Sequence, residues 1–287
     1  MFEYCADPAS LSGLDWLACY LTTGKHLDFY RSFGTVIALL VMAVPPIMAL
    51  GLLGALAKRS SILPVHAVGW GYTTMVRGVP DIVFFLFVPI ALDQGVEWLV
   101  HHLRCPDWTE PIRRGNDFVV CSAAKVPLTT AAPWIHDVYG FLLALIAYSV
   151  VFGAFAANVI DGAMRAVPRG QLEAGEAIGM SRFQILRRIH LPQMWLYALP
   201  GLSNLWMLLI KATPLLFLLG VEDIVYWARE LGGMKTQVFA YPHPDWRLWY
   251  FGALLIFYLG LTSISEFGFG RLMARVGRGH ARAAGSV

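Results

Sequence analysis

Residues 138–160 read VYGFLLALIAYSVVFGAFAANVI, and none of these 23 residues is Asp, Glu, Lys or Arg. A helix needs roughly 20 consecutive apolar residues to cross the hydrocarbon core of a bilayer. The segment 138–160 therefore predicts a transmembrane helix.

Four further apolar runs flank this segment, at 33–57, 81–100, 194–221 and 248–270. The whole chain has the same character, because 57% of its 287 residues are hydrophobic and only 14% are charged. A soluble domain carries about 25% charged residues. This composition excludes a disordered chain and argues against an ordinary cytosolic enzyme. The net charge of +3 gives no indication of a nucleic-acid partner.

The five runs predict an all-α membrane protein with five transmembrane helices. The less apolar segment 62–78 is expected to form a helix that lies at the membrane interface. Because residues 1–10 are acidic and lack a basic region, we expect no signal peptide. An odd number of spans places the two termini on opposite sides of the membrane.

The distribution of Lys and Arg predicts the orientation, because these residues are enriched on the cytoplasmic side. One orientation puts twelve of them inside and nine outside. We therefore expect a periplasmic N-terminus and a cytoplasmic C-terminus. In this layout the outer segments are 1–32, 101–137 and 222–247, and the inner segments are 58–80, 161–193 and a basic tail at 271–287.

The inner segment 161–193 contains the most informative motif. It reads Glu173-Ala174-Gly175, then three residues, Gly179, nine residues and Ile189-His190-Leu191-Pro192. We expect a short helix over 171–178, ended by Gly179 in a left-handed conformation. Ser181 can cap a second helix, which Pro192 is expected to end before the next span.

This pattern resembles the EAA signature of ABC-transporter permeases, with Gly175 in the place of the usual Ala. The resemblance implies that this helix–turn–helix docks into a cleft on a cytoplasmic ATPase. The alternative is an ordinary solvated loop, which the full spacing disfavours. The residues that the resemblance assigns to ATPase coupling are Glu173, Ala174, Gly175, Gly179, Arg182, Arg187 and Arg188.

Other segments are similar to polar amino acid permeases, notably Arg77-Gly78-Val79-Pro80 and Leu209-Ile210-Lys211-Ala212-Thr213. The second is similar to the histidine/lysine/arginine/ornithine and opine branch. The likeness places an importer transmembrane domain at 33–270. It fails over 1–32 and over 101–137, which is interpreted as a periplasmic insertion.

The likeness implies a multi-pass permease subunit in a bacterial inner membrane, surrounded by lipid. It also implies a dimer of ATPase subunits that bind ATP and Mg, a second permease subunit, identical or homologous, and a periplasmic substrate-binding protein. The chain itself has no GxxxxGK[ST] loop, so we expect no cofactor, no catalytic residues and no enzymatic activity on it. An ion-gradient-driven secondary amino acid transporter is the alternative, although the chain lacks the paired repeats typical of that class.

Lys211 is the outstanding residue for the substrate path, because a Lys in a span costs roughly 2.5–3.5 kcal/mol on insertion scales. It is expected to face the bundle interior or a wet cavity, where it contacts a substrate carboxylate or forms a gating ion pair. A snorkelling or structural Lys is the alternative. The further path candidates are Thr213, Asn204, Trp206 and Asn158.

Asn158 and Asp161 stand where relatives often carry Glu and Arg. This difference favours a neutral, zwitterionic or opine-type substrate over a cationic one.

All four cysteines fall in segments assigned to the outside, namely Cys5, Cys19, Cys105 and Cys121. Because the periplasm is oxidising, we expect disulfides, and local loop closure favours Cys5–Cys19 and Cys105–Cys121 over the other pairings. Four unpaired thiols are the alternative. His101, His102 and Cys105 match no firm zinc spacing, so no metal is expected.

Overall fold

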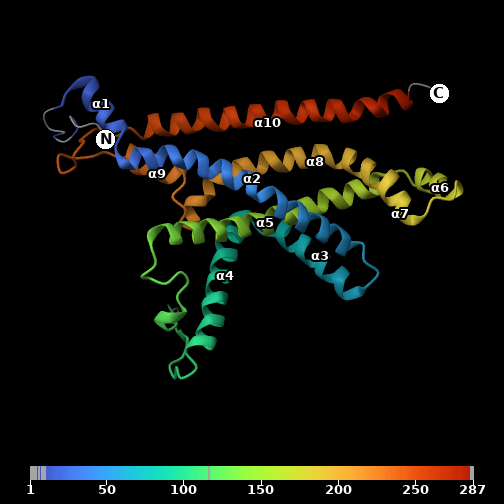
Figure 1. Cartoon of the computed structure of the whole chain (residues 1–287), viewed down its shortest axis with the longest axis horizontal. Coiled ribbons are helices and arrows are strands. Elements are labelled where there is room, and N and C mark those ends of the chain that lie inside the picture. The colour runs from blue at the N-terminus through green and yellow to red at the C-terminus, as the bar shows by residue number, and fades with distance from the viewer. Residues whose placement is uncertain (1–4, 6, 8–10, 116, 285–287) are drawn as a thin grey trace. The chain divides into compact units, whose positions relative to one another are not determined.

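The computed structural model describes residues 5, 7, 11–115 and 117–284 (Figure 1). Within this part of the chain, five helical segments are long and apolar enough to cross a membrane, which confirms the predicted number. Each of these segments contains most of one predicted apolar run. Four of the five begin before the predicted first residue, and the segment at 81 begins at it. The helices concerned are α2 (Gly24–Lys58), α4 (Asp81–Arg104), α5 (Pro133–Ala166), α8 (Leu191–Ala212) and α10 (Arg247–Ala284).

Shorter elements connect these helices. The helical ones are α1 (Gly13–Leu21), α3 (Leu63–Gly78), α6 (Arg169–Ala177), α7 (Arg182–Ile185) and α9 (Ile224–Gly232). Two 3₁₀ segments cover Ser122–Ala124 and Thr213–Leu219, and a π-helical turn covers Leu186–His190. The helix α3 forms where an interfacial helix was predicted.

The helices and their connections are grouped into two structural units, each made of three stretches of the chain. The first unit contains 1–42, 82–148 and 214–254. The second contains 43–81, 149–213 and 255–287. Each unit is described by itself below.

Small residues allow α2 and α5 to approach closely in the second unit. A Cβ atom added at Gly54 would lie 2.8 Å from the Cβ of Ala157, and one at Gly51 would lie 2.7 Å from the Cβ of Ala156. Such close backbone contacts are typical of helix pairs in membranes, where association depends on van der Waals packing. A buried cluster continues this core toward α8, with Ala55, Ile160, Ala163, Met164, Val167, Met194 and Ala198.

In the first unit, an aromatic cluster holds the N-terminal segment against the region before α10. The disulfide Cys5–Cys19 is buried here beside Tyr20 and Tyr241. The hydroxyl of Tyr20 donates to the carbonyl oxygen of Leu231 at 3.2 Å and lies 2.9 Å from Nε2 of His243. The segment assigned to the outside at the N-terminus is thus anchored in a small core of its own.

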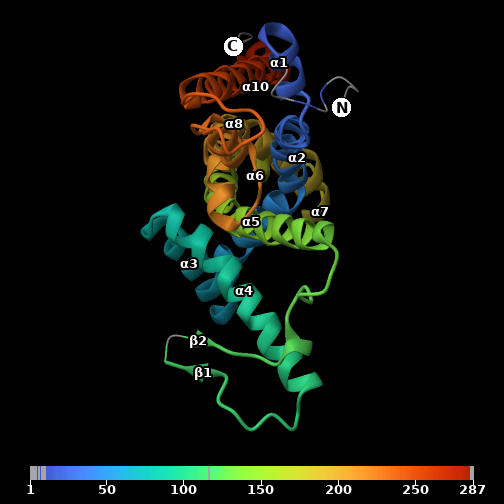
Figure 2. The same cartoon turned by 90° about the vertical axis from the view of Figure 1, so that its left-hand side faces the viewer.

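The connection between α4 and α5 contains a short antiparallel hairpin of β1 (Arg113–Arg114) and β2 (Asp117–Phe118). Figure 2 shows this hairpin and its connecting loops near the C-terminal end of α4. Because α4 reaches Arg104 and α5 starts at Pro133, the irregular part is 105–132, shorter than the predicted 101–137.

Two helix boundaries differ from the predictions. The run 194–221 is α-helical only to Ala212 and continues as the 3₁₀ segment, because Pro214 removes a backbone donor. The basic tail does not separate from the last span, since α10 continues to Ala284. Parts of the predicted segments 1–32 and 271–287 lie outside the described residues.

Candidate functional site

The turn after α6 is closed by a Schellman arrangement around Gly179. Its φ is +79°, in the left-handed region that favours glycine. The amide of Met180 donates to the carbonyl of Gly175 at 3.0 Å, and the amide of Gly179 donates to that of Glu176 at 2.9 Å. These two bonds satisfy carbonyls that the helix end would otherwise leave free. The left-handed Gly179 predicted from the sequence is therefore confirmed.

A capping box begins the second helix of the turn. The amide of Gln184 donates to Oγ of Ser181 at 3.3 Å, and the amide of Ser181 donates to Oε1 of Gln184 at 2.8 Å. The reciprocal bonds satisfy two donors at the start of α7. The predicted cap at Ser181 is confirmed, and both ends of the turn are defined by side chains of the motif itself.

Gly175 lets the two helices of the turn touch. It is buried, and an added Cβ would lie 2.8 Å from Cδ1 of Ile189 and 3.2 Å from Cγ1 of Ile185. A methyl group here would require the isoleucine side chains to shift. The glycine in place of the usual alanine therefore matches a close contact with α7 and the turn after it.

The prediction that Pro192 ends the second helix is wrong. The helix continues from Arg182 to Leu218, with the π-helical turn Leu186–His190 leading directly into α8. Proline has no amide hydrogen and clashes with the carbonyl four residues earlier in a regular α-helix. The wider turn immediately before Pro192 changes the local bonding pattern, so the helix passes through this position.

The surface of this helix–turn–helix, which we call the coupling turn (169–190), combines apolar and charged side chains. Ile178 and Phe183 are 78% and 68% exposed, and Leu186 is 44% exposed. The charged residues that the motif singled out, Glu173, Arg182, Arg187 and Arg188, are exposed, as is Ala174. Large apolar groups in water, rimmed by charges, are typical of a surface that binds another protein. Figure 1 shows the turn between α6 and α7.

Ile178 and Phe183 were missed in the sequence analysis. The available signal was two large apolar residues, Ile178 and Phe183, on either side of the turn at Gly179.

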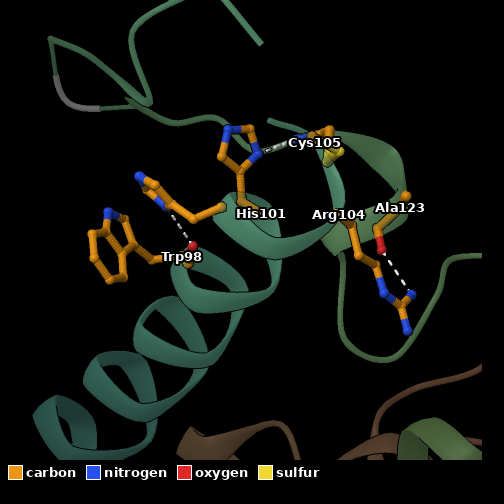
Figure 3. The surroundings of a disulfide bond; sticks show 7 residues. Trp98, His101, Arg104, Cys105 and Ala123 are labelled. Carbon is orange, nitrogen blue, oxygen red and sulfur yellow. Dashed lines mark hydrogen bonds between the residues drawn. A yellow bond between two sulfur atoms is a disulfide. The ribbon is translucent and has the colours of Figure 1, made fainter. Parts of the chain in front are cut away.

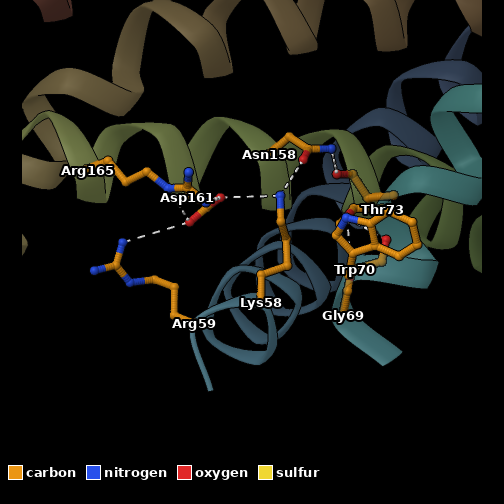
Figure 4. A network of polar contacts seen from close by, with 9 residues as sticks. Lys58, Arg59, Gly69, Trp70, Thr73, Asn158, Asp161 and Arg165 are labelled. Atoms are coloured by element: carbon orange, nitrogen blue, oxygen red, sulfur yellow. Dashed lines mark hydrogen bonds and ion pairs between the residues drawn. The ribbon is translucent and has the colours of Figure 1, made fainter. Parts of the chain in front are cut away.

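Asn158 belongs to a network of charges (Figure 4). The Lys58 ammonium donates to Oδ1 of Asn158 at 2.8 Å and lies 3.2 Å from Oδ2 of Asp161. Arg165 and Arg59 also approach this carboxylate, at 2.7 and 3.8 Å. Asp161 is only 4% exposed. Its buried charge is therefore compensated by three cations from α2, the following residue and α5.

The helix α8 separates the other path candidates onto different faces. Asn204 and Lys211 are both exposed and lie seven residues apart, which puts them on one face two turns from each other. Thr213 is fully buried. Its hydroxyl donates to the carbonyl oxygen of Ile210 at 2.9 Å and lies 2.9 Å from the hydroxyl of Tyr258. The half-buried Trp206 donates to Oγ of Ser265 at 2.9 Å. Asn204 and Lys211 thus share an exposed face, whereas Trp206 and Thr213, also seven residues apart, both bond to residues of α10.

The disulfide Cys105–Cys121, like Cys5–Cys19, joins the pair favoured from the sequence. Figure 3 shows His101 beside it. The amide of Cys121 donates to Nδ1 of the buried His101 at 3.1 Å, so Nδ1 carries no proton. His102 instead bonds the carbonyl of Trp98. His101, Cys105 and Cys121 lie close enough to hold a metal, but both sulfurs are in the disulfide.

Comparison with protein families adds to this geometry. Residues 21–278 match the family described as the binding-protein-dependent transport system inner membrane component. The match includes the five membrane-spanning segments, the coupling turn and the connection between α4 and α5. The segment 101–137, interpreted above as an insertion, therefore lies within the matched range.

Individual relatives have the same character. The chain is 30% identical over 246 residues to the arginine ABC transporter permease protein ArtQ of Escherichia coli, an alignment that covers 85% of this chain and 93% of the relative. It is 31% identical over 221 residues to the octopine transport system permease protein OccQ of Rhizobium meliloti, covering 76% and 81%. A crystal structure of an amino acid ABC transporter with histidines superposes with a TM-score of 0.56 at 20% identity, covering 93% of this chain and 99% of that one. At this identity the superposition concerns the fold alone.

Proposed function

The chain belongs to the family of binding-protein-dependent transport system inner membrane components, and from this we propose that it is the permease subunit of an importer for a polar amino acid or an opine. Transport is driven by ATP hydrolysis on a separate ATPase, which contacts the coupling turn. The observation that carries this proposal is the built turn itself. Gly179 and the capping box fix its shape, and Ile178 and Phe183 are presented on its surface.

The coupling turn suits a protein partner that opens and closes. Exposed apolar side chains supply contact area, and the exposed Glu173, Arg182, Arg187 and Arg188 supply orientation through charge. The partner in this proposal is a dimer of ATPase subunits that binds ATP and Mg. The chain itself has no phosphate-binding loop and acts as a transport subunit without a cofactor of its own.

A second permease subunit completes the path in this proposal. Lys211 and Asn204 are exposed on a helix that crosses the membrane. A Lys left in contact with lipid near the bilayer centre is costly. A second subunit, identical or homologous, placed over this face of α8 would enclose both polar residues in a shared aqueous path.

The substrate is an amino acid or opine whose carboxylate contacts Lys211. The named relatives carry arginine and octopine transport in their names. In this chain the carboxylate of Asp161 is already surrounded by cations, so the network at Asn158 offers no free negative charge to a cationic side chain. The substrate is delivered by a periplasmic binding protein, with the N-terminus of the permease periplasmic and the C-terminus cytoplasmic in the inner membrane.

The test is ATP hydrolysis by the complete complex in proteoliposomes, with the binding protein and substrate inside or outside. The variant Ile178→Ser with Phe183→Ser is expected to lower substrate-stimulated hydrolysis at least about tenfold, a loss of roughly 1.4 kcal/mol of coupling. Ile62→Ser is the matched control, since Ile62 is 59% exposed in a different connection. Unchanged stimulation in the double variant, or uptake that follows an ion gradient without ATP, contradicts the proposal.

A further inference from the structure

The second unit contains an apolar groove of about 520 Å³ between helices that cross the membrane. Val44, Ile47 and Met48 of α2 line one side, and Phe152 of α5 lies beside them. The opposite sides are formed by α8 and α10. Residues from these two helices that matter for the argument are Trp195, Trp206, Ser265, Gly268 and Leu272.

The groove is lined almost entirely by apolar side chains and by no charged group. Of its three side chains with a polar atom, Trp206 and Ser265 bond each other, with Nε1 donating to Oγ at 2.9 Å, and the third is the indole of Trp195. A polar ligand would lose its hydrogen bonds to water in such a groove without gaining new ones, whereas an apolar ligand would not. The groove is thus unsuited to an amino acid, and its occupant is expected to be a hydrocarbon chain.

Positive charge follows the groove at the C-terminal end of α10. Gly268, Leu272 and Arg275 are spaced by four and three residues, so they share one face of the helix. Arg271, on the same turn, lies over the ring of Phe267 with its guanidinium carbon 3.9 Å from the ring centre. Both arginines are exposed, and neither has an ion pair among the described residues.

We propose that this groove binds one acyl chain of an anionic phospholipid, with the phosphate held by Arg271 and Arg275. The groove would hold the acyl chain. Arg271 lies on the same turn of α10 as the lining residue Leu272, and Arg275 follows about one turn later, so both could reach a headgroup at this end of the groove. Basic pockets between membrane helices are known to select anionic headgroups. The orientation proposed above puts this end on the cytoplasmic side, but acyl binding in the groove does not depend on the transported substrate.

A second permease subunit is the competing occupant of the groove. The charge distribution favours the lipid, because two cations lie near one end and the rest of the lining is almost entirely apolar, with Trp206 and Ser265 already bonded to each other. The experiment below separates the two.

The test measures lipid bound to the purified full-length complex in nanodiscs that contain phosphatidylglycerol and phosphatidylcholine. Native mass spectrometry counts the retained lipid after release from the discs. Gly268→Leu places a side chain in the groove, where an added Cβ meets nothing within 4 Å. It is expected to lower retained phosphatidylglycerol about tenfold. Gly270→Leu is the control at the same depth, since it lies nearly opposite on the helix and also meets open space.

The double variant Arg271→Gln with Arg275→Gln tests the headgroup without altering the groove. It is expected to abolish the preference for phosphatidylglycerol over phosphatidylcholine, and it lies on an exposed surface where folding is not at risk. Wild-type retention in Gly268→Leu overturns the acyl site, and an unchanged preference in the arginine variant overturns the headgroup assignment. Loss of subunit assembly in Gly268→Leu with lipid retention intact would identify the groove as a subunit interface and also overturn the proposal. ATP-coupled uptake is measured for the same variants. Uptake at the wild-type level would show that the transport function does not depend on this lipid.

Discussion

The ammonium of Lys58 at the end of α2 lies 3.2 Å from the carboxylate of Asp161 in α5, and their side chains are only 15% and 5% exposed. A buried charge that loses its partner is strongly destabilising, by about 3–5 kcal/mol. Asp161→Asn, which leaves Lys58 without its counter-ion, is therefore expected to lower the thermal unfolding temperature in detergent by several degrees.

Adding Lys58→Met to Asp161→Asn is expected to restore part of that loss, because it removes the uncompensated charge. Arg31→Gln is the control, since the pair Arg31–Asp28 is largely exposed and contributes less than about 1 kcal/mol. Equal unfolding temperatures for Asp161→Asn and the control would show that the network does not stabilise the fold.

Gly179 provides a second prediction. A β-branched residue at its φ of +79° is strained by more than the roughly 1–2 kcal/mol of an ordinary residue. Gly179→Val is expected to distort the coupling turn and abolish substrate-stimulated ATP hydrolysis, while membrane insertion stays normal. Gly170→Val is the control, because this α6 residue has ordinary helical backbone and an added Cβ meets nothing within 4 Å. Hydrolysis that survives in Gly179→Val would refute the docking role of the turn.

Lys211 and Thr213 are predicted to fail in different ways. Lys211→Met keeps the length of the side chain and removes its charge, so uptake at limiting substrate is expected to fall at least about tenfold with the complex assembled.

Thr213→Val removes a buried hydroxyl that contacts Ile210 and Tyr258. It is expected to cost about 1 kcal/mol of stability and to leave the apparent affinity for substrate unchanged. The reverse pattern would place Thr213, and not Lys211, on the path.

Asp223, which caps α9, predicts a pH dependence of stability. Burial raises the pKa of this carboxyl to about 6, although the amides of Val225 and Tyr226 donate to Oδ1 and act in the opposite direction. Oδ2 has no hydrogen-bond partner among the described residues. Between about pH 4 and pH 6 the folded chain therefore binds more protons than the unfolded one. The free energy of unfolding falls as the pH rises through this window and levels off above it.

Asp223→Asn keeps a capping side chain and removes the ionisation. In the parent protein this group changes the free energy of unfolding by roughly 3 kcal/mol across the window, and the variant is expected to lack this change. Its unfolding temperature should therefore vary less than that of the parent between pH 4.5 and pH 7.5. Parallel curves for the two proteins would show that Asp223 does not titrate in this range.

The five spans could be predicted because apolar run length is a direct property of the sequence. The ends of the helices could not, because helix α2 begins at Gly24, well before the apolar run at residue 33. Polar residues such as Lys25 and His26 there gain partners from far along the chain, namely Glu230 and Tyr250. Hydropathy contains no information on such contacts.

The candidate site shows the same division. The caps at Gly179 and Ser181 follow from local chemistry and were predictable. The path candidates on α8 were not resolved into faces, because every residue of a long apolar run has similar hydropathy and the buried face depends on the neighbouring helices. Likewise, the pairing of Asn158 with Lys58 joins residues 100 positions apart.

The unbroken helix from Arg182 to Leu218 makes the coupling turn and the middle of the membrane parts of one rod. At about 1.5 Å per residue, Arg182 and Lys211 are separated by about 45 Å along its axis. If the ATPase tilted this helix at Arg182, Lys211 at the other end would move sideways. Such a movement would need no chain of contacts between side chains. The π-helical turn at Leu186–His190 is where the hydrogen-bonding pattern of this helix changes, so bending there would reduce the movement at Lys211.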